Sequence, residues 1–479
     1  MSGRPRTEVA TRSSRYHTTA DTGPRRDKRV SPSAGFWVLT GFLSTVFVLG
    51  GSARGDVASL IFLRPIAVLT CAWGLIRLDA ETVRRWRGLL SLASAIIILP
   101  ALHLVPLPSA IWQSLPGHEI VFAISKSVGI AGSARPLSLS PLDTLNAEFS
   151  LFVPLATLLL AVQLPKRDRH RLLFVVLGLG ALSAAIGALQ AINPDSAALR
   201  FYRVDNATAS VGLFANRNHQ ALLLACMLPL AAVFTAFAHA DRRIRGGILI
   251  CIVCMLVPLL LVTGSRAGLI TGFLGVLSLF ALRSPARDGD GPKTGWIGIG
   301  SKWFVPAIVL FVLFLGAILQ SNRAEAFQRL FASTPLDDAR WKLWQPAIKA
   351  TLDYMPLGSG IGSFVSTYQV YETRGLLSPT YRNHAHNDFI EIAMTGGVPA
   401  LVLLAVAVVG WARLVSRWIR QPRRSQEVLY GRLGAVMVLL FGVASFVDYP
   451  ARVPTLACVL TLAAVWMFGD PAARGHLRQ

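Results

Sequence analysis

Apolar residues fill most of the chain in long runs, and polar segments separate these runs. A helix needs about 20 mostly apolar residues to cross a bilayer, with a range of roughly 17 to 25. The pattern therefore predicts about twelve transmembrane helices and an all-α, polytopic membrane protein. The predicted spans are 36–53, 57–76, 88–107, 147–164, 171–192, 218–239, 246–263, 267–282, 303–320, 390–412, 432–448 and 453–468.

The composition agrees with a membrane protein, because 53% of the 479 residues are hydrophobic and only 15% are charged. Residues 1–34 are rich in Arg, Ser and Thr and show no apolar period. We expect them to form a disordered basic tail ahead of a membrane domain at 35–479. All five cysteines fall inside apolar runs, so we interpret them as packing residues rather than as a disulfide framework.

The basic residues predict the orientation of the spans. If the N-terminus is cytoplasmic, 31 of the 47 Lys and Arg residues fall in segments on the cytoplasmic side. Both termini are then cytoplasmic, and clusters such as 166–171 and 241–245 anchor the protein at the anionic inner leaflet. The net charge of +22 therefore needs no nucleic-acid partner to explain it.

This orientation places three sizeable segments outside the cytoplasm, at 108–146, 193–217 and 321–389. The last is the largest, and a connection of this length is usually functional. Within it, Asp337 or Asp338 is expected to cap a helix that passes through Arg340 and lies flat at the membrane surface. The glycine-rich stretch 355–362 lacks the Lys-Ser/Thr pair of a phosphate-binding loop, so we expect a tight turn there.

Two arginines oppose the inside preference for positive charge. Arg217 immediately precedes the sixth span, and Arg266 is the only charge in the short outer turn between the seventh and eighth spans. Either they reach toward lipid headgroups, or they face inward together and hold a diphosphate. Arg64 lies about seven residues inside the second span. It reaches the same anion or pairs with an acid such as Glu148.

The segment 382–389 carries the densest group of titratable side chains next to a span. His384 and His386 are two residues apart, so on a helix they point to opposite sides and only one can face a site. The neighbouring Asn387 and Glu391 favour His386, which could accept a proton from an acceptor hydroxyl or hydrogen-bond it. A solvated loop histidine is the alternative. No tight Asp-x-Asp pair occurs, so the sequence predicts no metal and no cofactor.

Several short motifs occur in a fixed order along these spans. They are Gly212-x-x-x-Asn216-x-Asn218-His219, Ser265-Arg266, Arg340 with Trp344, the glycine-rich stretch up to Phe364, and His386-Asn387. Together they resemble the O-antigen ligase and polymerase superfamily over residues 205–410, with weaker similarity at 136–144. The chain departs from the family pattern at Trp344, where the family has Leu, and at Ala400, where the ligases have Gly.

The resemblance implies a GT-C-like, inverting and metal-independent glycosyltransferase in the bacterial inner membrane, with its active site on the periplasmic face. The donor would be a glycan on polyprenyl diphosphate, and the acceptor lipid A core or another lipid-linked glycan; the spacing after the His-Asn pair favours the ligase slightly. Its catalytic residues would be His386, Arg266, Arg217 and Arg340. Its substrate-binding residues would be Asn387, His219, Asn216, Arg64, Trp344 and Glu391.

Two classes of protein compete with this interpretation. A transporter predicts ionisable residues along a path through the membrane centre, whereas this chain concentrates them at the outer rim. A twelve-span transporter is also commonly built from duplicated halves, and no sequence repeat relates the two halves of this chain. A non-catalytic scaffold would leave the outward arginines unexplained.

Overall fold

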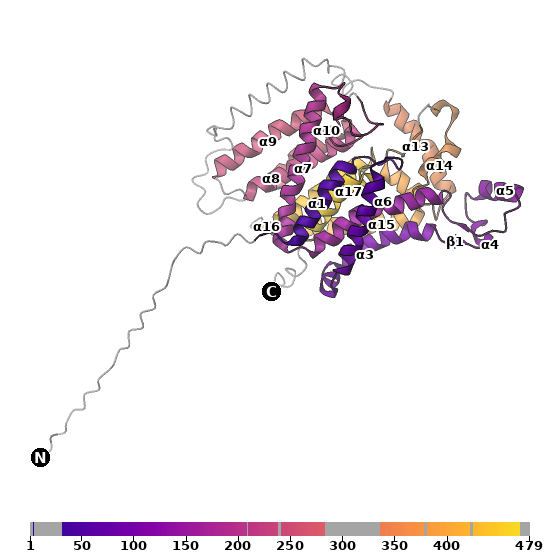
Figure 1. The fold of residues 1–479 in the computed structure, drawn as a ribbon, viewed down its shortest axis with the longest axis horizontal. Helices are drawn as coiled ribbons and strands as arrows, with labels where there is room; N and C mark the ends of the chain where they lie inside the picture. Colours follow the sequence, from indigo (N-terminus) through magenta and orange to yellow (C-terminus); the bar gives the residue numbers. More distant parts are fainter. Residues whose placement is uncertain are drawn as a thin grey trace. The chain divides into compact units, whose positions relative to one another are not determined.

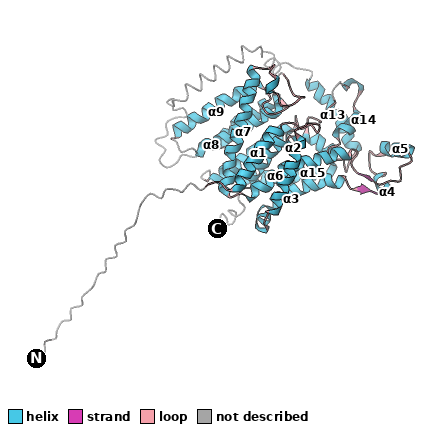
Figure 2. Cartoon of the chain, viewed as in Figure 1, coloured by secondary structure: helices cyan, strands magenta, loops and turns pink. Residues whose placement is uncertain are grey.

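The structure is a computed structural model, and it describes Gly3 and residues 31–207, 209–237, 241–282, 336–377, 381–421 and 425–469. Most of the predicted basic tail and the whole predicted span 303–320 fall outside these residues. Helices account for nearly all the described secondary structure (Figure 2). The described strands, β1 (Pro106–Leu107) and β2 (Arg135–Pro136), form one short antiparallel pair.

Each of the other eleven predicted spans overlaps one apolar helix in the described residues (Figure 1). Seven of these helices are long and apolar enough to cross a membrane, and four are shorter. The prediction of an all-α, polytopic membrane protein is therefore confirmed. The eleven helices are α1 (Ala34–Leu49), α2 (Leu60–Ile76), α3 (Ala80–His103), α6 (Pro141–Gln163), α7 (Lys166–Ile192), α8 (Arg217–Phe237), α9 (Arg242–Val262), α10 (Arg266–Ala281), α15 (Asp388–Arg420), α16 (Gln426–Ser445) and α17 (Pro454–Phe468).

Several helices extend beyond their apolar runs. The helix α3 begins eight residues before the predicted span, because the Asp79 carboxylate caps it by accepting a hydrogen bond from the Thr82 backbone N–H. Likewise α15 continues to Arg420, past the predicted end at 412. Apolar runs therefore locate the helices, whereas capping residues set their ends.

The helix α8 lies at the centre of the bundle, with 89% of its most apolar window buried. It is apolar on all sides, as expected for a helix surrounded by other helices. The helix α10 packs closely along it, and a Cβ atom added at Gly268 would lie 2.5 Å from the Ala221 Cβ. A Cβ atom added at Gly180 of α7 would likewise lie 2.8 Å from the Met227 sulfur of α8, whereas Gly178 has open space around it.

A second, smaller core lies in the large loop and joins it to α15. It is built by α13 (Leu336–Asp353) and α14 (Phe364–Tyr371), whose buried residues pack with Ala385 and Met394. The expected helix is present, and its described part, Leu336–Asp353, includes Asp337 and Asp338, so both lie within the helix rather than ahead of it. The remaining short helices are α4 (Ser109–Trp112), α5 (Glu119–Ser127), η1 (Ala197–Leu199), η2 (Arg374–Leu376) and η3 (Pro450–Arg452).

The glycine-rich stretch 355–362 forms a tight loop that holds the first part of α15. At Gly397 the helix is kinked by a left-handed backbone conformation with φ of 58°. The loop docks there, because Pro356 accepts a 2.7 Å hydrogen bond from the Val398 N–H and the Gly360 N–H donates a 2.9 Å bond to Thr395. The predicted tight turn is confirmed. It fixes the direction in which α15 leaves the His384–Asn387 segment.

Candidate functional site

His386 stands in an unusual backbone conformation at the start of α15. Its φ is +51°, and no other non-glycine residue in the described ranges has a positive φ. Such a conformation is uncommon outside glycine and costs free energy, so the surroundings must hold it. Asn387 supplies part of that support: its Oδ1 caps α15 at Phe389 and Ile390, and its Nδ2 donates to the Phe446 carbonyl at 3.0 Å.

The Asp448 carboxylate lies behind His386, in the short connection between α16 and α17. One oxygen lies 3.4 Å from the His386 Nδ1, and the other lies 3.7 Å from the His219 Nε2 and accepts a hydrogen bond from Asn216. Burial alone would raise the pKa of this carboxyl, but the His219 and His386 rings outweigh it and hold the pKa well below its usual range. Asp448 is therefore a buried anion facing two imidazoles.

Three histidine rings surround Tyr449. Their centroids lie 4.2 Å (His384), 5.1 Å (His386) and 5.3 Å (His219) from the centroid of the phenol ring. Burial raises the pKa of Tyr449, so its hydroxyl stays protonated at neutral pH. Tyr449 thus separates the three imidazoles and fixes the positions of their rings.

An ion cluster anchors the other side of this segment. The Arg452 guanidinium contacts Asp388 at 3.1 Å and Glu391 at 3.3 Å. Glu391 also contacts the His384 Nδ1 at 3.0 Å and accepts a 2.9 Å hydrogen bond from the Ala385 N–H. Glu391 is only 1% exposed, so its carboxylate orients the loop from behind. Its predicted substrate contact stays a prediction.

Arg217 and Arg266 are the first residues of α8 and α10. The two helix starts are tied together, because the Ser265 hydroxyl caps α10 and also donates a 2.7 Å hydrogen bond to the Asn218 side chain. Asn216, one residue before α8, reaches Asp448. The structure therefore places the chain segments of both arginines beside the His386–Asp448 pair.

The remaining predicted residues are placed as follows. The Trp344 indole donates a 3.0 Å hydrogen bond to the Ala385 carbonyl, which brings α13 against the histidine segment. The Arg340 side chain is not among those described. The Arg64 guanidinium donates a 2.7 Å hydrogen bond to the Asn146 side chain, so its partner is an amide rather than Glu148, the acid offered as one alternative. The other alternative, a contact with the donor anion, stays a prediction.

Sequence reasoning missed Asp448, Tyr449 and Arg452. All three lie in residues 448–452, where Asp448 is the last residue of the predicted span 432–448 and the other two lie between it and the span 453–468. The argument that singled out Arg266, a charge confined to a short turn between spans, applies equally to this segment. What the sequence could not supply is the pairing of Asp448 with His386, which lies 62 positions earlier.

The buried part of the cluster carries polar atoms without hydrogen-bond partners in the described chain. They are both ring nitrogens of His219, the Nδ1 of His386 and one oxygen of Asp448. Unpartnered buried groups are rare and are typical of functional sites. The His386 side chain is 27% exposed, whereas that of His219 is 2% exposed, so His386 is the imidazole that a substrate can reach.

No group of three or more His, Cys, Asp or Glu residues in the described ranges could hold a metal ion. The arrangement instead combines an accessible imidazole, a buried carboxylate behind it and two neighbouring helix N-termini that each begin with arginine. Such a site can move a proton at the histidine and stabilise an anion at the helix starts.

Residues 250–405 match the family model described as O-antigen ligase. Arg266, Arg340 and His386 fall inside the matched range, whereas Arg217 and Asp448 fall outside it. A comparison with curated proteins finds no match. The match over residues 250–405 supports the resemblance that the motifs indicated, to membrane glycosyltransferases of the O-antigen ligase and polymerase type.

Proposed function

We propose that the protein transfers a glycan from a polyprenyl diphosphate donor to an acceptor hydroxyl on the periplasmic face of the bacterial inner membrane, as an O-antigen ligase. The observation that carries the proposal is the contact between His386 and Asp448 beside the starts of α8 and α10. A base and an anion-binding element are the two parts that inverting transfer from a diphosphate requires.

The donor diphosphate would bind at the two helix starts. Arg217 and Arg266 offer forked guanidinium groups, whose geometry suits paired phosphate oxygens. The N-termini of α8 and α10 add partial positive charge at the same place. These groups stabilise the negative charge that grows on the leaving diphosphate, which makes them catalytic rather than merely binding groups.

The acceptor hydroxyl would meet His386. Because the ring turns its Nδ1 toward Asp448, its Nε2 is the nitrogen that faces a substrate. The buried Asp448 anion stabilises the imidazolium that forms when His386 takes the hydroxyl proton, in the way a buried carboxylate supports a catalytic histidine elsewhere. His219 lies on the far side of the same carboxylate, so it supports the base from within the protein.

The transfer then takes place in one displacement step. The acceptor oxygen forms a bond to the anomeric carbon while its proton passes to His386. The bond between that carbon and the diphosphate oxygen breaks, and polyprenyl diphosphate leaves with the electron pair. Attack from the side opposite the leaving group inverts the anomeric configuration. Arg340 would assist from α13, and Trp344 would hold the histidine segment in place.

Ligase and polymerase differ only in the acceptor, lipid A core or another lipid-linked glycan. A strain that lacks the protein distinguishes them. The ligase assignment predicts that lipid A-linked glycan disappears while lipid-linked polymer accumulates. A surface that retains single capped units shows a polymerase instead, and unchanged polysaccharide would contradict both assignments. The strain complemented with His386→Ala, inserted at wild-type levels, should resemble the deletion.

A further inference from the structure

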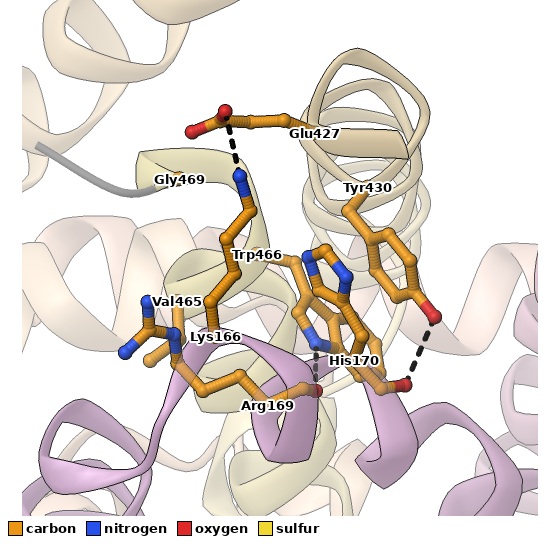
Figure 3. A pocket seen from close by; sticks show the side chains of 8 residues that line it. All are labelled: Lys166, Arg169, His170, Glu427, Tyr430, Val465, Trp466 and Gly469. Atoms are coloured by element: carbon orange, nitrogen blue, oxygen red, sulfur yellow. Dashed lines mark hydrogen bonds and ion pairs between the residues drawn. The ribbon is translucent and has the colours of Figure 1, made fainter. Parts of the chain in front are cut away.

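Two basic regions, one at the start of α7 and one at the C-terminal end of α15, differ in the ion pairs that their side chains make. At the start of α7, the Lys166 ammonium pairs with Glu427 at 3.0 Å, as Figure 3 shows, and Arg171 pairs with Asp168 at 2.8 Å. The His170 ring stacks on the Tyr430 ring of α16, with the two centroids 3.9 Å apart. At the start of α7, two of the basic residues therefore have carboxylate partners within the protein.

The last turns of α15 carry three arginines whose charges the described residues do not neutralise. They are Arg413, Arg417 and Arg420, and none of them makes an ion pair within the described parts of the chain. They are not needed to cap the helix, because Arg432 of α16 already donates to the carbonyls of Trp418 and Gln421. Three neighbouring cations that make no ion pair with the described residues favour an anionic ligand.

A groove accompanies these arginines. It has a volume of about 460 Å³ and is lined by Val409, Ala412, Arg413, Ser416, Arg417 and Arg420. The Arg417 guanidinium lies 4.8 Å from the centre of the Trp418 ring, and Trp418 is buried and donates to the Met467 carbonyl. The aromatic ring thus holds one of the three guanidinium groups in place before any ligand binds.

The same face of α15 is apolar farther from the arginines. Val402, Val406 and Val409 are exposed and lie on one helical stripe with Arg413, at intervals of four, three and four residues. The stripe from Val402 to Arg420 is about 27 Å long at 1.5 Å per residue. An exposed apolar stripe that ends in unneutralised cations matches the outline of a lipid, with acyl chain along the valines and phosphate at the arginines.

We propose that the end of α15 binds the headgroup of an anionic phospholipid, with the acyl chain against the valine stripe. The chemistry recognised is the phosphate diester, and the valine stripe identifies its source as a lipid rather than free phosphate. In the orientation proposed above, this site faces the inner leaflet, where anionic headgroups attract juxtamembrane arginines. The site is separate from the glycan-transfer site and does not depend on the activity.

Native mass spectrometry of the purified protein in neutral detergent, titrated with phosphatidylglycerol, tests the proposal. The triple variant Arg413→Gln, Arg417→Gln, Arg420→Gln should weaken binding on the order of 100-fold, because each arginine near a headgroup contributes about fivefold. The matched control Arg77→Gln, Arg84→Gln, Arg87→Gln removes the same charge at α2 and α3. It should change binding by less than about threefold, which is less than one such arginine contributes.

Three results would overturn the site. Equal losses in both triple variants would show diffuse attraction, equal binding of phosphatidylcholine would show that charge is irrelevant, and displacement of the lipid by equimolar inorganic phosphate would identify a free anion as the ligand. If the α15 triple variant does not fold, the single change Arg420→Gln replaces it. About fivefold weaker binding is then expected, and unchanged affinity contradicts the proposal.

Discussion

Where α7 meets α16 and α17, polar side chains bind partners on neighbouring helices (Figure 3). Lys166 pairs with Glu427. Tyr430 and Trp466 donate hydrogen bonds to the backbone carbonyls of His170 and Arg169, respectively. At the His386 end, His219, His386 and Asp448 all keep buried polar atoms without a hydrogen-bond partner in the described residues. The first arrangement stabilises the bundle. The second is the one expected where a substrate completes the contacts.

The strongest test of this difference is His386→Ala. Loss of the base should lower kcat by about 10²- to 10⁴-fold, the usual contribution of a general base, in a variant that still folds and inserts into the membrane. His384→Gln is the matched control, because its ring faces Glu391 and Tyr449 rather than Asp448. It should retain activity to within about tenfold, well short of the loss of a base. Comparable losses in both variants would remove His386 from its proposed role.

Arg266→Ala should have the next largest effect. Removing one group that stabilises developing charge typically lowers kcat by about 10²- to 10³-fold, and donor affinity should fall as well. Arg266→Lys should recover only part of the activity, because an ammonium cannot form the forked contact. The control variant Lys166→Gln, at the start of α7, should transfer glycan at the wild-type rate. Full activity in Arg266→Ala would mean that this arginine only contacts headgroups.

The two halves of α15 allow a comparison of stability. In Gly397→Ala the new Cβ would clash with the Pro356 carbonyl oxygen in the glycine-rich loop, and φ of +58° strains any residue other than glycine. We expect a loss of about 1–3 kcal/mol and reduced transfer activity. Gly410→Ala, on the same helix with nothing within 4 Å, should be neutral or stabilising by up to about 1 kcal/mol. Thermal unfolding in detergent measures both.

The smallest predicted effect depends on pH. The folded state lowers the pKa of Asp448, so it favours the charged carboxylate. That stabilisation is fully present above the unfolded value of about 4 and is lost as the pH falls through the folded-state pKa. Asp448→Asn should therefore lower the free energy of unfolding at pH 7 by about 1–2 kcal/mol. The difference from the wild type should shrink as the pH falls. Glu427→Gln should cost less than about 1 kcal/mol, because its partner Lys166 is partly exposed.

Apolar periodicity predicted most of the fold, because a bilayer demands long continuous apolar helices. The sequence also singled out the His386–Asn387 pair and the two arginines, since these polar residues stand where a span ends. The kink at Gly397 and the docking of the glycine-rich loop were not. They depend on hydrogen bonds between residues about 40 positions apart, such as Pro356 and Val398.

The rest of the site depends on which helices pack together, and local pattern does not encode that. Asp448 and Arg452 reach the histidines only because α16 packs against both α8 and α15. Glu391 illustrates the same limit. Its position near the end of a span marked it as a candidate, but its contacts with the His384 ring and the Ala385 N–H could not be predicted from that position.

The most direct test of glycan transfer at the His386 end is reconstitution of the purified protein in proteoliposomes with a labelled glycan on polyprenyl diphosphate and lipid A core. We predict that label moves to lipid A core, that free polyprenyl diphosphate is released in equal amount, that chelators have no effect, and that His386→Ala abolishes transfer. Donor that crosses the bilayer with its glycan still attached, and no glycosylated product with any acceptor, would contradict the account and identify a transporter.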